Sequence, residues 1–156
     1  MTDYLLTRTL IEKLPHGADL YEELMRIAQS ENICIGRISA IGATTHAIVA
    51  YYDQATKMYN PLEFKGGMEI LGLQGNISIR DGKPFVHAHL LLGDRDGKIF
   101  GGHLLPGTKL FACEIYIDIF EGPELIRVLD EQTGLYLWKS GHHPQQVMFP
   151  GSAETD

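Results

Sequence analysis

Apolar residues recur along this chain with two different periods, and each period predicts a different kind of element. After Asp19 they are spaced as on one face of an α-helix, at Leu20, Leu24, Ile27 and Ala28. Asp19 is a typical helix N-cap, and Glu22, three residues later, is the reciprocal partner of a capping box. Asn32 is a typical stop. The pattern predicts one main helix that lies on one face of a sheet.

Most of the remaining chain has the composition of β-strands. Apolar or alternating runs, separated by turn-forming residues, predict strands over residues 4–10, 33–43, 45–53, 57–65, 69–79, 85–92, 98–104, 109–120 and 135–138. In the run 109–120, alternation predicts one face with Phe111, Cys113, Ile115, Ile117 and Ile119. Pro123 suits the first turn of a helix, so a short helix is predicted over residues 123–129.

The connections between these strands decide the fold class. They are short, which favours antiparallel pairing, because parallel neighbours need long crossovers. Seventeen glycines, spread through the turns, fit such a hairpin-rich plan. A chain of 156 residues predicts one domain, over residues 1–140, followed by an irregular tail over residues 141–156. The expected class is α+β, with a mostly antiparallel β-sheet and one main helix packed on it.

Composition narrows the possible partners and location. The net charge is −7, with thirteen basic against twenty acidic residues. Nucleic acids favour a basic surface, so this charge disfavours a nucleic-acid partner, and a local basic patch stays open as the alternative. No run of eighteen apolar residues exists, so no membrane span is expected. The first residues lack the features of a signal peptide, which favours a cytoplasmic location. Cys34 and Cys113 lie in apolar surroundings and are expected to be buried, reduced thiols.

Three of the seven histidines lie close together in one predicted hairpin. His87 and His89 are two residues apart and therefore share a face of their strand. A three-residue loop over 95–97, with Gly97 in the left-handed position, places His103 directly opposite His89. A two-residue loop, Asp96-Gly97, would turn His103 to the other face, and a bulge at Gly101-Gly102 would re-aim it. The histidine group therefore depends on the register.

Three imidazoles on one face predict a site for a divalent metal. Zinc is favoured because imidazole suits it, while nickel, copper and iron stay open. Three protein ligands leave a coordination position free, as in catalytic zinc sites. A reaction would also need a general base, for which Glu69 is the first candidate, followed by Glu114 and Asp118. Glu69 would alternatively serve as a fourth ligand or orient a ligating imidazole.

Several segments together resemble the plant and prokaryote conserved (PPC) domain. They are Gly82-Lys-Pro-Phe-Val-His-Ala-His89, Asp94-Arg-Asp-Gly97 and Gly101-Gly-His-Leu-Leu-Pro-Gly107, supported by Glu69-Ile-Leu-Gly-Leu-Gln-Gly-Asn76. The resemblance runs from about residue 5 to residue 122 and extends through Thr133-Gly134. It implies a largely antiparallel sheet, a homotrimer as in prokaryotic members, and a metal site at His87, His89 and His103 near a subunit boundary.

The resemblance also implies a function class. Members are commonly described as predicted DNA-binding proteins, but plant relatives contact DNA through Arg-Gly-Arg segments that this chain lacks. The expectation is a stand-alone PPC-domain protein that binds metal, forms a homotrimer and acts as a regulatory or interaction module, with a DNA-binding role taken only from the family. The alternative is a hydrolase-like metal-dependent enzyme acting on a small molecule through the three histidines and Glu69. A third possibility is a metal that only stabilises the trimer.

Overall fold

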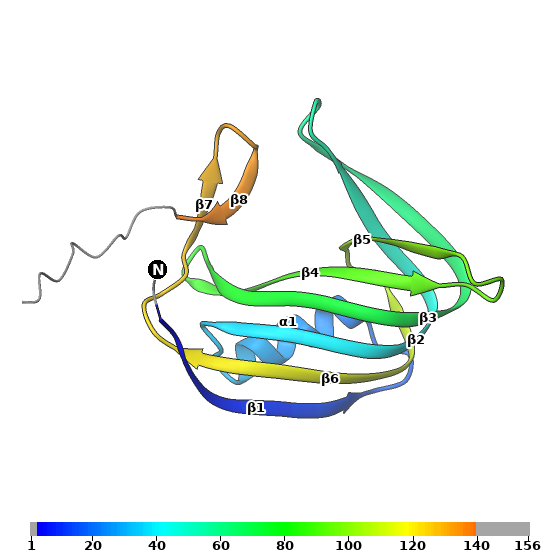
Figure 1. Cartoon of the computed structure of the whole chain (residues 1–156), viewed down its shortest axis with the longest axis horizontal. Coiled ribbons are helices and arrows are strands. Elements are labelled where there is room, and N and C mark those ends of the chain that lie inside the picture. Colours follow the sequence, from blue (N-terminus) through cyan, green and yellow to red (C-terminus); the bar gives the residue numbers. More distant parts are fainter. Residues whose placement is uncertain (1–2, 140–156) are drawn as a thin grey trace, which may run out of the picture.

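A computed structural model describes residues 3–139 of the chain (Figure 1). The predicted tail over residues 141–156 lies outside the described residues. The elements in chain order are β1 (Leu5–Leu14), α1 (Leu20–Ser30), β2 (Gly36–Asp53), β3 (Met58–Arg80), β4 (Lys83–Gly93), β5 (Ile99–Leu104), β6 (Lys109–Glu121), β7 (Arg127–Asp130) and β8 (Leu135–Trp138). No helix among them is long and apolar enough to cross a membrane.

Six strands form one antiparallel sheet, and α1 covers one face of it (Figure 1). The strand order is β1-β6-β2-β3-β4-β5. The far end of β2 also pairs with β5, at Val49 and Ala50, so that β2 to β5 close into a ring at that end of the sheet. β7 and β8 form a separate two-stranded hairpin. The predicted α+β class, a mostly antiparallel sheet with one helix, is confirmed.

The main helix begins and ends where its sequence signals predict. The Asp19 side chain accepts a hydrogen bond from the backbone N–H of Glu22 at 3.2 Å, which is one half of the predicted capping box. Its second oxygen accepts from the Gly107 N–H at 2.6 Å, so the cap also fixes the helix to the β5–β6 turn. Asn32 has a φ of 50° just after the helix. The predicted apolar stripe is buried against the sheet, at Leu20, Leu24, Ile27 and Ala28.

Two pairs of predicted strands are continuous in the structure. Residues 33–43 and 45–53 belong mainly to β2, which passes through a register shift between Thr44 and His46 without ending. Residues 57–65 and 69–79 belong to β3 except for Lys57, although Gly66 has a φ of 98° between the two runs. Glycine adopts this backbone conformation without a Cβ clash, so the strand continues through it. The end of β2 and the start of β3, joined by the turn over residues 54–57, form a long arm that extends beyond the rest of the sheet (Figure 1).

The predicted helix over residues 123–129 is wrong. Residues 127–130 are strand β7, which pairs with β8 from Arg127 opposite Trp138 to Asp130 opposite Leu135. Ile126 and Val128 are β-branched and favour a strand, and pairing with β8 outweighs the helix-start preference of Pro123. The strand predicted over 135–138 is present with these bounds, but its partner is β7.

One side-chain direction in β6 also differs from the prediction. Phe111 is exposed, whereas Leu110 and Cys113 are buried. The reason is a bulge: Thr44 lies opposite Leu110 while Ala43 lies opposite Ala112, so the alternation shifts by one residue. Cys113 is buried as expected, and burial raises the pKa of its thiol to about 11. The other cysteine, at position 34, is only partly buried.

The arm and the β7–β8 hairpin are joined by hydrogen bonds at their tips. The Tyr52 hydroxyl donates to the carbonyl of Thr133 at 2.7 Å, and the Lys57 ammonium donates to the carbonyl of Glu131 at 2.9 Å. Both segments rise from the sheet in the same direction in Figure 1. Together with β4 and β5 they enclose a hollow.

Candidate metal centre

The β4–β5 hairpin has the three-residue turn that brings the histidines together. The Gly97 N–H donates to the Asp94 carbonyl at 3.1 Å, and the Asp94 N–H donates to the Lys98 carbonyl at 3.0 Å. Gly97 has a φ of 78°, the left-handed position that this turn requires. His89 consequently lies directly opposite His103. The predicted register is confirmed, and the two-residue alternative is excluded.

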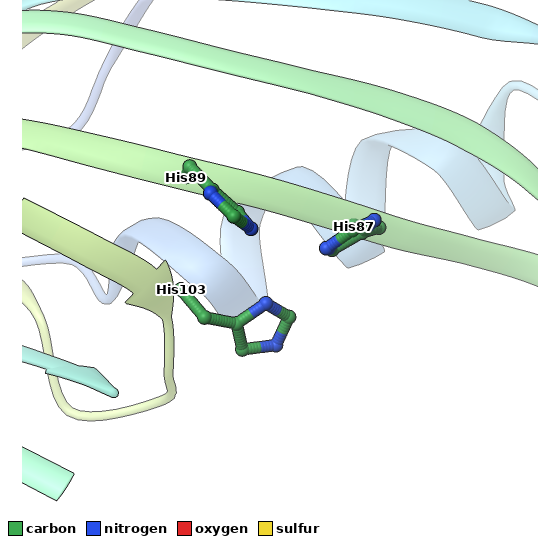
Figure 2. A group of neighbouring side chains, drawn as sticks. All are labelled: His87, His89 and His103. Atoms are coloured by element: carbon green, nitrogen blue, oxygen red, sulfur yellow. The ribbon is translucent and has the colours of Figure 1, made fainter. Parts of the chain in front are cut away.

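The three imidazoles point toward one another from two strands. His87 and His89 extend from β4, and His103 extends from the end of β5 (Figure 2). Each offers one ring nitrogen, and these nitrogens all lie within 4.8 Å of one another. The ring centroids are 5.0 to 5.6 Å apart. Nitrogens this close are able to converge on a single ion with modest side-chain adjustment.

Two glycines allow β5 to pass between β4 and β2 beside the histidines. A Cβ at Gly101 would lie 2.6 Å from the carbonyl oxygen of Leu90 in β4. A Cβ at Gly102 would lie 2.6 Å from the carbonyl oxygen of Ala50 in β2. Contacts this short with backbone atoms cannot be relieved by a side-chain rotation. Glycine at both positions therefore sets how close His103 comes to β4.

Burial keeps two of the imidazoles in the form that binds a metal. Desolvation, followed by the charge of Arg127, lowers the pKa of His87 to about 4. Desolvation, followed by the neighbouring histidines, lowers the pKa of His103 to about 4 as well. Both rings are neutral at neutral pH, and a neutral imidazole has a lone pair to donate.

One atom of the cluster lacks a partner. The Nδ1 of His103 is buried and makes no hydrogen bond within the described part of the chain. Leaving such a group unsatisfied costs about 1–3 kcal/mol. Tyr59 stacks on the same ring, with centroids 4.7 Å apart, and restricts its rotation. An unpartnered nitrogen within a set of three imidazoles fits a metal ion.

Arg127 is the residue beside the histidines that sequence reasoning missed. Its side chain, from β7, is only 7% exposed. Its Nε donates to the Ser78 hydroxyl at 2.8 Å, and its terminal nitrogens donate to the Asn76 side chain and the Tyr136 carbonyl, both at 2.7 Å. One terminal nitrogen also lies 3.4 Å from Nδ1 of His87. The guanidinium is therefore fixed at the edge of the cluster. Burial, followed by the charge of Arg80, lowers its pKa.

A signal for this arrangement was present in the sequence. Ile126, Val128 and Leu129 and all of residues 135–138 are apolar or aromatic, and a four-residue segment ending in Gly134 separates residue 130 from residue 135. Two such runs around a glycine-containing loop are typical of a hairpin. A hairpin at this position would have placed Arg127 on a strand instead of a helix. Its contact with β3 joins residues about fifty positions apart, and no local pattern predicts that.

The histidines form part of the wall of a hollow with a volume of about 480 Å³. The arm contributes Tyr52 and Tyr59, and the hairpin contributes Arg127, Tyr136 and Leu137. No aspartate or glutamate is among the residues of the described chain that line it. The hollow thus combines nitrogen ligands, aromatic surface and positive charge.

The structure does not bring the three candidate bases to the histidines. Glu69 lies opposite Gly93, four residues along β4 from His89, which corresponds to about 13 Å. Glu114 and Asp118 lie on β6, which β2 and β3 separate from β4. Asp118 is also engaged by Arg37 at 2.6 Å, and hydrogen bonds to Thr9 and Arg37 lower the pKa of its carboxyl.

Known proteins share this architecture. A metal-containing protein from Archaeoglobus fulgidus is 40% identical, with a TM-score of 0.84 over 89% of this chain and 98% of that one. A PPC protein from Pyrococcus horikoshii is 33% identical, with a TM-score of 0.85 over 90% of this chain and 96% of that one. The bifunctional protein GlmU of Synechococcus sp. (strain JA-2-3B'a(2-13)) is 34% identical over 76% of this chain. The chain spans only 15 to 18% of the length of the curated relatives it matches.

A family assignment follows from the sequence match. The profile of the Plants and Prokaryotes Conserved (PCC) domain, the PPC domain named above, matches residues 1–121. That range takes in β1 to β6, α1 and all three histidines, and it ends before Arg127. The chain belongs to the Plants and Prokaryotes Conserved domain family.

Proposed function

We propose that the protein is a metal-binding module in which His87, His89 and His103 hold one divalent ion, with zinc favoured. The observation that carries the proposal is the set of three ring nitrogens within 4.8 Å of one another. The unpartnered nitrogen of His103 adds to it. The metal-containing Archaeoglobus relative supports a metal here, although it does not identify the ion.

In this proposal the chain holds the ion at the wall of the hollow and leaves room for one further ligand. Three protein ligands leave a coordination position free, and a zinc ion bound there polarises whatever small molecule occupies it. Tyr59 fixes the ring of His103 by stacking. Arg127 places a positive charge next to His87. We expect the module to work as a homotrimer in the cytoplasm and to serve a regulatory or interaction role.

The alternatives have less support. A hydrolytic reaction would need a base at the metal, and Glu69 lies about 13 Å along the sheet from His89. Solved relatives from Bacteroides thetaiotaomicron and Ralstonia eutropha are described as putative DNA-binding proteins. Direct binding to DNA gains most of its strength from basic residues that neutralise phosphates, and this chain has a net charge of −7.

Titration of metal-free protein with Zn²⁺ tests the proposal. Calorimetry is expected to show saturation at one equivalent per chain, because the three histidines make one site. Co²⁺ in place of Zn²⁺ reports the ligands through its visible absorption, which should change when all three nitrogens bind. If neither Zn²⁺ nor Co²⁺ binds at one equivalent per chain, the three histidines are only packed against one another and form no metal site.

Replacement of Gly102 by alanine tests how the backbone positions the site. The new Cβ would lie 2.6 Å from the Ala50 carbonyl, so β5 has to move away from β2 and His103 moves with it. We expect zinc affinity to fall about tenfold, the lower end of the loss seen when a group that orients a metal ligand is changed. The matched control is Gly72→Ala, where the new Cβ meets no atom within 4 Å. Equal zinc affinities in the two variants would contradict the prediction.

A further inference from the structure

The hollow beside the histidines contains more positive charge than the described chain neutralises. Arg127 lines it, is almost fully buried and forms no ion pair with a carboxylate of residues 3–139. Arg80 lines the same hollow, and its partner Asp81 is exposed at 3.5 Å. Exposed ion pairs at such distances contribute little stabilisation, so Asp81 compensates the charge of Arg80 only weakly. The lining residues include no carboxylate of the described chain.

A bound metal would increase this imbalance. The three imidazoles are neutral ligands and do not cancel the charge of a divalent ion. The ion would then lie close to Arg127, which is 3.4 Å from the ring of His87. Like charges in a half-buried site repel strongly because water screens them poorly. An anion in the hollow would remove the repulsion and compensate both groups.

The guanidinium of Arg127 is fixed by hydrogen bonds in the orientation that it would need to bind an anion in the hollow. Three of its N–H groups donate at 2.7 to 2.8 Å to Ser78, Asn76 and Tyr136. One hydrogen on the nitrogen that bonds to Tyr136 has no acceptor in the described chain. A guanidinium fixed in this way loses little conformational freedom on binding. It also favours carboxylate oxygens, with which it forms short charged hydrogen bonds.

The rest of the wall indicates what the anion is attached to. Tyr59, Phe85 and Leu137 present aromatic and aliphatic surface to the hollow. The volume of about 480 Å³ suits a small organic molecule. Inorganic phosphate would leave most of this apolar surface uncovered.

We infer that the hollow binds a small organic carboxylate, with its charged end at Arg127 and the metal position and its apolar body against the aromatic wall. The inference rests on the proposed metal site and adds the chemical class of the ligand. It assigns to Arg127 the role of the carboxylate-binding residue. It also gives the β7–β8 hairpin, which lies beyond the residues that the family profile matches, a part in binding.

Benzoate is a suitable probe, with benzamide as its neutral counterpart and inorganic phosphate as an anion without an apolar body. Calorimetry on the zinc-loaded full chain should show benzoate binding at least about tenfold more tightly than benzamide, because a charged hydrogen bond is lost in the amide. Phosphate should also bind more weakly than benzoate. Benzamide or phosphate binding as tightly as benzoate would overturn the inference.

Variants assign the effect to Arg127. Arg127→Gln should lower benzoate affinity at least about tenfold. Arg127→Lys retains the charge without the forked guanidinium, so its benzoate affinity should lie between those of the wild type and Arg127→Gln. The control is Arg95→Gln, which removes an arginine that is 93% exposed in the β4–β5 turn and should leave benzoate affinity unchanged. Equal losses in Arg127→Gln and Arg95→Gln, or no loss in either, would refute the role of Arg127.

The wild-type chain provides a test that does not depend on the folding of variants. Because coupling between two ligands is reciprocal, benzoate should raise zinc affinity by the same factor by which zinc raises benzoate affinity. Zinc that binds with equal affinity with and without benzoate refutes the carboxylate site while leaving the metal site intact. Absence of zinc binding refutes the metal site instead, so the two failures are distinguishable.

Discussion

Alanine in place of His89 is expected to weaken zinc binding by at least about a hundredfold. Loss of a group that merely supports a metal ligand costs about 10–100-fold in affinity, so loss of a ligand itself should reach or exceed the upper end. His89 is the exposed member of the cluster. Its removal leaves no cavity in the core, and the fold should remain intact. Calorimetric titration in competition with a chelator of known affinity measures the change.

His46→Ala is the matched control for this experiment. His46 lies on β2, with its Nε2 3.4 Å from a carboxylate oxygen of Glu63, and it belongs to no metal-ligand group in residues 3–139. This variant should bind zinc like the wild type. Wild-type affinity in His89→Ala, or an equal loss in both variants, would mean that zinc binds elsewhere on the chain.

Alanine at Gly42 is expected to destabilise the fold by about 4 kcal/mol. Its Cβ would meet the carbonyl oxygen of Ala112 and approach the Cα of Cys113 to 2.8 Å, both backbone atoms of the neighbouring strand β6. Overpacking costs about 1–3 kcal/mol, and the φ of 156° at this position adds backbone strain for any other residue. Guanidinium denaturation at fixed protein concentration measures the loss.

Gly72→Ala is the control for the Gly42 variant. Gly72 also lies at a register shift in the sheet, but a Cβ there has open space and its backbone is not in the left-handed region. A small gain of about 0.5 kcal/mol is expected, because alanine reduces the freedom of the unfolded chain. Similar denaturation midpoints in the two variants would show that β2 and β6 separate easily at Gly42.

The fold and the histidine register were predictable because their signals are local. The helix follows from Asp19 and an apolar stripe, and the register follows from Gly97, whose position in the turn sets the pairing of His89 with His103. Each of these signals acts over a few residues. The stripe and the turn chemistry agree with the final packing, so local reasoning was sufficient.

The parts that sequence reasoning missed depend on contacts between distant segments. Arg127 reaches Asn76 and Ser78, and nothing near position 127 in the sequence indicates this. The outward direction of Phe111 results from a bulge that exists only when β6 lies against β2. Glu69 directly precedes an apolar run in the sequence, and this position gives no information on its distance from the histidines.

The pairing of β1 with β6 has a consequence for how quickly the protein folds. Leu5 lies opposite Glu121, so β1 cannot join the sheet until nearly the whole chain has been brought together. Such non-local pairing is slow, on the order of milliseconds to seconds, because the loop must close before the contacts form. The hairpin that contains His89 and His103 is local and forms in about 1–10 μs. His89 and His103 are therefore expected to be paired well before β1 completes the sheet.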